Sequence, residues 1–567
     1  MHEVTMPFYF VEGNRKMAER YGIVVSTSHC EPMMRNSATE WDLAGKGDYN
    51  FLKNRQAVVD YWTDRLKELG HSDNIFTMGM RGKHDGRMIG VKNTHEYKDA
   101  LNAVLQVQDS LLRQYIHPDS KKIPQQFVPY KEVLDVYRAG LEVPDHITLV
   151  WPDDNYGYIR HFPDEKERKR TGGNGVYYHT SYWGEPHDFL WLGIVQPSLM
   201  YQQMKTAYDR NMRKIWVLNV GDIKPSEYLT EFFLDMAWDI NLSGCKGGSG
   251  IVFSHLGNWL NQTFGKKTGK ELLPLMKDFY LLSHIRKPEF MGNTRTYDKR
   301  HEQIADLPWS TEEINERLER FKKLSDRVEK LYATVPSNRK EAYFEMIQYP
   351  VQASNEMNKK MLYAQFARHT PSDSASLWKK SDAAYDSIVS LTRRFNSLLD
   401  GKWNHIISTA PRGLIVFDKV KRTASSTALV SSPAPLQLWN GTEHDAVTGQ
   451  HTVIDGLGHS GKAIYLGKGG TVEYEYRNFR KDSLTVEVCL VPTHAVEGGK
   501  LRFAVSTDDR EPQVFDCETA EYSEEWKVNI LRAQAVKTAR FPSGSRKGRI
   551  KITALDEGVV IDQIRLR

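Results

Sequence analysis

The first 286 residues alternate short apolar runs with amphipathic stretches. Segments such as 54–69 and 97–115 carry apolar residues at helical spacing and lie between the runs. This alternation of strand and helix favours a parallel sheet covered by helices. Six apolar runs fit strands of such a sheet: 23–26, 75–80, 126–129, 147–151, 176–179 and 215–220.

The glycine motifs of nucleotide-binding sheets are missing from this region. No GxGxxG follows the first run, and no GxxxxGK[ST] occurs, so neither a dinucleotide fold nor a P-loop fold is predicted. A (β/α)8-type barrel is the better interpretation. About six strands are found where such a barrel has eight, so we expect a barrel that is incomplete at its N-terminal side.

In residues 287–410 the spacing of apolar residues changes to one typical of helices. Ser310 and Glu313 form a capping box in front of an apolar stripe, and similar stretches run over 338–367 and 374–399. This region is predicted to be a helical bundle. The stripe recurs at three- and four-residue steps and consists of Ile314, Leu318, Phe321, Leu324, Val328 and Leu331.

Residues 411–567 alternate apolar and polar positions with a period of two. Segments 472–476 and 484–490 are clear examples, and 501–506 and 559–566 behave alike. Short alternating strands separated by turns predict a β-sandwich. The fold class is therefore multidomain α/β + α + β, with predicted domains at 1–286, 287–410 and 411–567. Residues 424–435, rich in Ser, Thr, Ala and Pro, are a candidate linker.

Composition changes this picture little. The net charge of +5 arises from 77 basic and 72 acidic residues that are interspersed, which argues against a nucleic-acid partner. Four distant cysteines without a CxxC pair predict neither a zinc site nor a disulfide framework, although a Cys489–Cys517 bridge stays open. No apolar run of about 18 residues predicts a membrane span, and residues 1–4 lack the start of a signal peptide.

Polar clusters follow the apolar runs, where a parallel sheet forms its site. They read SHCEPMMRN, MRGKHDG, VPYKE and WPDDN, with the densest stretch at 151–191. Paired carboxyl groups suit glycoside hydrolysis, in which one protonates the leaving oxygen and another activates water or attacks carbon. An arginine suits a substrate carboxylate, and no cofactor or metal signature occurs. The candidates are His29, Glu31, Arg81, Asp85, Glu132, Asn155, Tyr182, Trp183 and Glu185.

Each candidate also has a purely structural interpretation. Asp153 or Asp154 is a possible cap for the segment that follows. His29 is a possible buried histidine, Glu132 a helix-opening carboxylate, and the aromatic pair 182–183 possible core residues. The recurrence of polar groups after strand after strand favours the functional interpretation.

These motifs, with YYHTSYWGEPHDFLW, WVLNVGDIKP and, near the end, GLGHSGKAIYLG and VVIDQIRLR, closely resemble the α-glucuronidases of glycoside hydrolase family 115 over the whole chain. The resemblance implies removal of glucuronic acid, or its 4-O-methyl ether, α-1,2-linked to xylose in glucuronoxylan. It also implies inversion, no cofactor, a periplasmic or secreted location and a possible homodimer. No nucleic acid or membrane is expected as a partner.

The resemblance also assigns roles to single residues. Asp85 and Glu132 match catalytic positions, with Glu132 as general acid and Asp85 as base or water-orienting group, or the reverse. His29, Arg81, Asn155 and Tyr182 match substrate contacts, and Arg81 is the candidate for the uronate carboxylate; Glu31, Trp183 and Glu185 are second choices. Inversion predicts a carboxyl separation of about 6.5–9.5 Å.

The departure from the family lies at the start. Family members carry an N-terminal domain, then a barrel strand ending in an acidic motif and another ending like WPAMH, whereas this chain begins at MHEVTMPF. We expect two strands to be absent, and exposed edges to make the chain poorly soluble and weakly active or inactive. The alternatives are a non-catalytic carbohydrate-binding protein and a glycosidase for another uronic acid or a neutral sugar. If the substrate is a neutral sugar, Arg81→Ala should lower activity no more than other substitutions in the cleft.

Overall fold

The computed structural model describes two compact units. Unit 1 comprises Met1–Pro152, His161–Tyr177 and Ala207–Val217, and unit 2 comprises Asp153–Arg160, Tyr178–Thr206 and Leu218–Arg567. Most of the candidate linker 424–435 lies outside the described residues. These are 3–5, 12–69, 73–221, 223–292, 304–423, 434–477, 483–508, 510–542 and 546–567.

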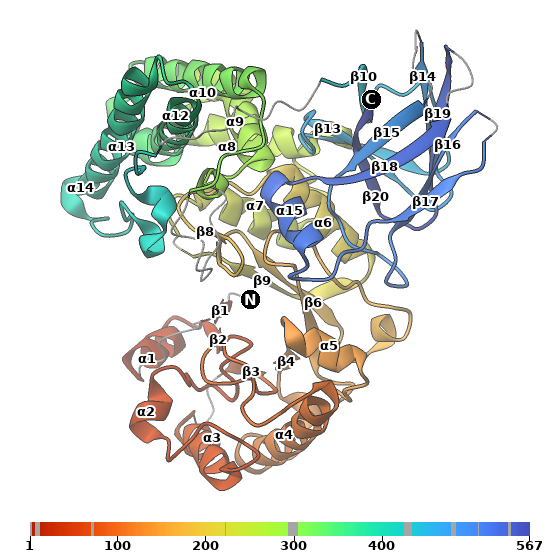
Figure 1. Cartoon of the computed structure of the whole chain (residues 1–567). Helices are drawn as coiled ribbons and strands as arrows, with labels where there is room; N and C mark the ends of the chain where they lie inside the picture. The colour runs from red at the N-terminus through yellow and green to blue at the C-terminus, as the bar shows by residue number, and fades with distance from the viewer. Residues whose placement is uncertain are drawn as a thin grey trace. The chain divides into compact units, whose positions relative to one another are not determined.

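A seven-stranded sheet runs through the first part of the chain in the order β1-β2-β3-β4-β5-β6-β9 (Figure 1). All six predicted strands are present, and the strand pairs from β1 to β6 are parallel. One further strand, β1, was not predicted. The bounds are β1 (Glu3–Thr5), β2 (Val24–Ser26), β3 (Asn74–Thr77), β4 (Gln125–Phe127), β5 (Thr148–Pro152), β6 (Asn174–His179) and β9 (Met212–Asn219).

Every residue of β3 and β5 is buried, which explains why these strands show no alternation of apolar and polar residues. Helices α3 (Arg55–Leu69) and α4 (Thr94–Tyr115) contact each other and bury one apolar side each. The sheet interior is partly polar. Gln126 on β4 donates hydrogen bonds to Ser26 Oγ at 2.6 Å and Thr77 Oγ1 at 3.2 Å, and so links three neighbouring strands.

The middle of the chain is helical, and the predicted helices are present. The main ones are α8 (Ile251–Phe264), α9 (Lys266–Ile285), α10 (Thr311–Tyr332), α12 (Tyr349–His369) and α13 (Ser374–Asn396). The Ser310–Glu313 capping box opens α10 as predicted. No described helix is both long and apolar enough to cross a bilayer.

The last part of the chain forms the predicted sandwich of two antiparallel sheets. One has the order β12-β13-β20-β15-β18, with β10 beside β20, and the other the order β11-β14-β19-β16-β17. On β14 (Thr471–Tyr476) alternate residues enter the core, which is the period of two seen in the sequence. Cys489 and Cys517 are both free thiols, so the bridge that the sequence left open does not form. Helix α15 (Glu524–Arg532) also belongs to this part of the chain. The remaining strands are β10 (Gln437–Asn440), β11 (Ala446–Thr448), β12 (His451–Asp455), β13 (Lys462–Leu466), β15 (Ser483–Leu490), β16 (Arg502–Thr507), β17 (Gln513–Asp516), β18 (Ala535–Pro542), β19 (Gly548–Ala554) and β20 (Val559–Leu566).

The fold class is therefore multidomain α/β + α + β, as predicted, while the three domain boundaries stay a prediction.

Candidate active site

One guanidinium in unit 1 holds both predicted catalytic carboxyl groups. Arg81 follows β3, and its Nε and Nη2 donate to the two Glu132 oxygens at 3.0 and 2.9 Å. Its Nη1 donates to Asp85 Oδ1. The Arg81 side chain is only 3% exposed, so the guanidinium of this charge-assisted bridge is shielded from water. Glu132 is placed for it as the first residue of α5 (Glu132–Arg138).

Asp85 has two further partners. His29 Nε2 lies 3.2 Å from its Oδ1, and Lys131 Nζ lies 3.3 Å from its Oδ2. Burial alone would raise the pKa of Asp85, but the His29 hydrogen bond and the charges of Arg81 and Lys131 outweigh it and lower that pKa well below its usual range. The Asp85 side chain is still 39% exposed, so this carboxylate is ionised and accessible.

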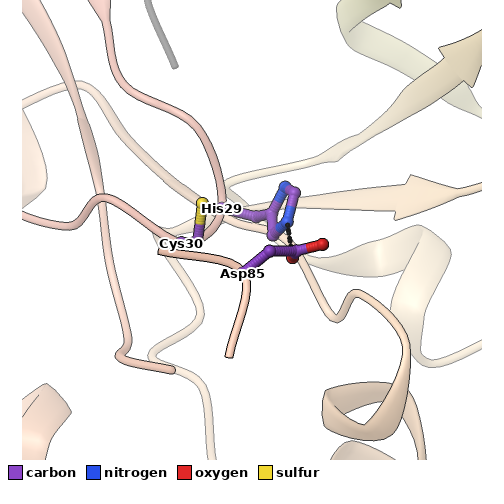
Figure 2. Close-up of side chains that lie close together, drawn as sticks. All are labelled: His29, Cys30 and Asp85. Atoms are coloured by element: carbon purple, nitrogen blue, oxygen red, sulfur yellow. Dashed lines mark hydrogen bonds and ion pairs between the residues drawn. The ribbon is translucent and has the colours of Figure 1, made fainter. Parts of the chain in front are cut away.

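His29 is the neutral member of the cluster. Burial lowers its pKa to about 4, although Asp85 acts in the opposite direction. Its ring centroid lies 4.1 Å from that of Tyr130 and 5.7 Å from that of Tyr177. Figure 2 shows the imidazole beside the Asp85 carboxylate, with Cys30 next to both. A neutral ring beside an ionised carboxylate donates its Nε2 proton, which fixes the tautomer.

Glu31 has a different environment from the other candidates. It is fully buried and accepts hydrogen bonds from the backbone N–H of Ser37 and, at 3.2 Å, from the Ser37 hydroxyl. Burial raises the pKa of Glu31 to about 8. Its hydrogen bonds fix the loop that carries His29, and its role as a substrate contact stays a prediction.

The neighbouring donor atoms do not fit a metal ion well. Those of His29, Cys30 and Asp85 lie within 4.8 Å of one another, as do those of Cys30, Glu31 and His84. A metal needs the thiolate, but burial raises the pKa of the Cys30 thiol to about 12. Arg81 and Lys131 already neutralise Asp85, so the local charge disfavours a further cation.

Backbone strain gathers around the strand ends. The five non-glycine residues with φ between 51° and 71° in these loops are Met33, Met34, His84, Lys131 and Asn155. Such conformations cost free energy and persist where surrounding contacts enforce them, often at functional sites.

The segment after β5 belongs to unit 2 and carries Asn155. Here Asp153 accepts a hydrogen bond from His179 Nδ1 at 2.5 Å, which ties this segment to the end of β6. Both aspartates accept backbone N–H groups from the residues that follow, so the capping interpretation is confirmed for both. Asn155 and Gly157 bond to Asp153, and Tyr156 and Tyr158 to Asp154.

The other unit 2 candidates lie on or beside the short hairpin of β7 (Tyr182–Trp183) and β8 (Asp188–Phe189). Tyr182 is buried, and its hydroxyl donates to the Glu185 carbonyl at 3.1 Å. Trp183 is 54% exposed, so it is not a core residue. Glu185 is exposed as well.

The structure brings His29, Arg81, Asp85 and Glu132 together in unit 1, with Glu31 behind them. Asn155, Tyr182, Trp183 and Glu185 belong to unit 2, where Asn155 is held by its own loop. The polar clusters in the sequence contain Lys131 and His179, but no individual role was predicted for either of them or for Tyr177. Lys131 had a usable signal, because it directly precedes Glu132 in VPYKE.

Comparisons with known proteins define the class to which this protein belongs. The sequence model described as glycosyl hydrolase family 115 matches residues 2–290, and the one for the C-terminal domain of that family matches residues 444–567. The protein is therefore a glycoside hydrolase, and its substrates are carbohydrates. The chain belongs to glycoside hydrolase family 115.

A solved structure of high similarity agrees with this assignment. One described as a family GH115 4-O-methyl-α-glucuronidase, BtGH115A, with specificity for decorated arabinogalactans, is 49% identical with a TM-score of 0.94, over 100% of this chain and 74% of that chain. The C-terminal CBM6 of LamC, a laminarinase from Zobellia galactanivorans, is 12% identical with a TM-score of 0.18, over 23% of this chain and 97% of that chain. The second score is too low to support any conclusion. No curated protein matches the chain.

Proposed function

We propose that the protein removes α-linked glucuronic acid or its 4-O-methyl ether from a decorated polysaccharide, with inversion. The observation that carries this proposal is the Arg81 bridge, which places two carboxyl groups with different surroundings in one cluster. An inverting glycosidase needs such a pair, one group as acid and one as base.

The surroundings of the two groups favour one assignment. The depressed pKa of Asp85 keeps it ionised, which excludes it as a proton donor at neutral pH and suits it to orient the attacking water and accept its proton. Glu132 is then the general acid, which requires that it takes up a proton and gives up one of its two Arg81 hydrogen bonds before the reaction. Water attacks the anomeric carbon as the glycosidic bond breaks, the Glu132 proton passes to the leaving oxygen, and the uronate leaves as the β-anomer.

Arg81 fits a bridging role better than the predicted role of binding the uronate. Three of its five N–H groups already bond to Asp85 and Glu132, and its side chain is almost fully buried. Lys131 is 16% exposed at its side chain and lies beside Asp85. We therefore assign the uronate carboxylate to Lys131. The other predicted substrate contacts stay part of the proposal, without an assigned group of the substrate: His29, Glu31, Asn155, Tyr182, Trp183 and Glu185.

Two polysaccharides are candidate substrates. The motif resemblance points to xylose in glucuronoxylan, whereas the 49% identical BtGH115A is described as specific for decorated arabinogalactans. Both glycans belong in the test. Action on such polymers implies a periplasmic or secreted location, and a homodimer is also part of the proposal.

The test is release of the uronic acid from each glycan, with proton NMR of the first anomer formed. Any uronic acid that the wild type releases should be the β-anomer, and Asp85→Asn and Glu132→Gln should each lower its kcat at least about a thousandfold. Asp99→Asn is the matched control, because Asp99 is an exposed carboxylate on α4. Folded wild type that binds these glycans without turnover would refute the proposal and indicate a non-catalytic carbohydrate-binding protein.

A further inference from the structure

Asp154 ties the segment after β5 to the C-terminal sandwich. We name residues 153–158 the two-aspartate loop. Asp154 Oδ1 serves the loop itself, whereas Oδ2 accepts a hydrogen bond from Trp526 Nε1 at 3.1 Å and lies 3.4 Å from His494 Nε2. All three residues are buried. Trp526 lies on α15, and His494 lies in the segment after β15.

His494 is held between two carboxylates. Its Nδ1 lies 2.9 Å from Glu518 Oε1, and its Nε2 faces Asp154. Burial by itself lowers the pKa of His494, but Glu518 and Asp154 outweigh it and raise the pKa to about 9. At neutral pH the ring is therefore an imidazolium, and both of its N–H groups donate.

Trp526 also contacts the loop through its ring. The Trp526 and Tyr156 ring centroids lie 5.6 Å apart, and Tyr156 meets Tyr182 edge-on at 5.5 Å. The Tyr156 hydroxyl donates to the His187 carbonyl at 2.8 Å and accepts from the His187 N–H at 3.0 Å. Contacts thus run from α15 through Tyr156 to the β7–β8 hairpin.

We propose that Trp526 and His494 are positioning residues for the hydrolase reaction. They hold the two-aspartate loop, and through Tyr156 the β7–β8 hairpin, so that Asn155 and Tyr182 are fixed in place. Asn155 has a φ of 71°, a left-handed conformation that asparagine adopts more readily than most residues and that contacts of the loop can stabilise. The inference rests on the proposed function, because it takes Asn155 and Tyr182 as substrate contacts.

The first test needs no substrate. Trp526→Phe removes the donor to Asp154 but keeps an aromatic ring in the same place. Hydrogen exchange of the backbone amides in residues 153–158 should become about tenfold faster. Exchange rates in the C-terminal sandwich should stay unchanged. Trp439→Phe is the matched control, because Trp439 lies on β10 and packs on the sandwich core. Unchanged exchange in Trp526→Phe would overturn the proposal.

The second test measures uronate release as a double-mutant cycle. Trp526→Phe should lower kcat/KM about tenfold in the wild type and have almost no effect in the Asn155→Ala background, because both changes act through the same contact. His494→Gln, which keeps one donor for Asp154, should show the same pattern with a smaller loss. Equal losses in both backgrounds would indicate a general structural effect and overturn the positioning role.

The two tests separate the proposals. If wild type releases no uronate from either glycan, the proposed function fails, and the exchange measurement alone decides whether Trp526 holds the loop.

Discussion

The stability of the protein should fall at alkaline pH through His494. The ordinary pKa of this group is 6.5, and its folded-state pKa is raised to about 9 by Glu518 and Asp154, against the opposing effect of burial. A raised pKa of a base contributes stability that is complete below pH 6.5 and is lost as the pH rises through about 9. The difference of about 2.5 pKa units corresponds to about 3 kcal/mol at 1.36 kcal/mol per unit.

The assay compares urea unfolding of wild type and His494→Gln between pH 6 and pH 10. The measured quantity is the difference in unfolding free energy between the two proteins, because other buried groups also titrate in this range. They include Glu31 and Lys360, whose pKa values are shifted by burial to about 8 and about 7. The variant should be less stable than wild type by about 3 kcal/mol at pH 6, and the gap should close by pH 10. His451→Gln is the matched control, because His451 is an exposed histidine of the same sandwich.

A constant gap between wild type and His494→Gln over this pH range would refute the reasoning. It would mean that His494 is neutral in the folded protein and contributes through packing alone.

Three further predictions concern the cluster and the scaffold. Arg81→Lys should lower kcat more than about a hundredfold with little change in KM, since an ammonium cannot bridge two carboxylates in fork geometry; a raised KM at unchanged kcat would instead support uronate binding by Arg81. Gly157→Ala should cost about 2 kcal/mol in chemical denaturation, because Gly157 has a φ of +95° and a Cβ there would lie 2.8 Å from the Tyr178 hydroxyl; no loss would show that this loop can relax. Ser310→Ala should cost about 1 kcal/mol in the same assay by removing the capping box of α10, whereas unchanged stability would show that tertiary packing alone holds that helix end.

The strands and helices were predictable because burial imposes a clear period on them. All six predicted strands of the parallel sheet are present, and the alternation of residues 472–476 matches the burial of β14. Strand β1 was missed because its three residues, Glu3–Thr5, are too few to show any period. The hairpin of β7 and β8 has two residues in each strand and gives no signal either.

The side chains around Arg81 could be named from the sequence, and their role as a catalytic site stays a prediction. Their hydrogen bonds could not be predicted. Polar residues after strand ends pointed to Asp85 and Glu132, yet nothing in the sequence shows that one arginine bonds to both. The partners of Asp154 could not be predicted either, because His494 and Trp526 follow it in the sequence by 340 and 372 residues. Hydrogen bonds over such separations are set by tertiary folding, which local periodicity does not encode.

The adjacent aspartates of the WPDDN motif bond to different parts of the chain. Asp153 bonds to His179 at the end of β6, and Asp154 bonds to Trp526 and faces His494 in the sandwich part of the chain. Each carboxylate also folds the loop by accepting two of its N–H groups. The segment that presents Asn155 is thus fixed from two sides, and loss of either side leaves a buried carboxylate with an unfilled acceptor. A single aspartate cannot supply four oxygen contacts to the loop and reach both neighbours, which gives a physical reason for the pair.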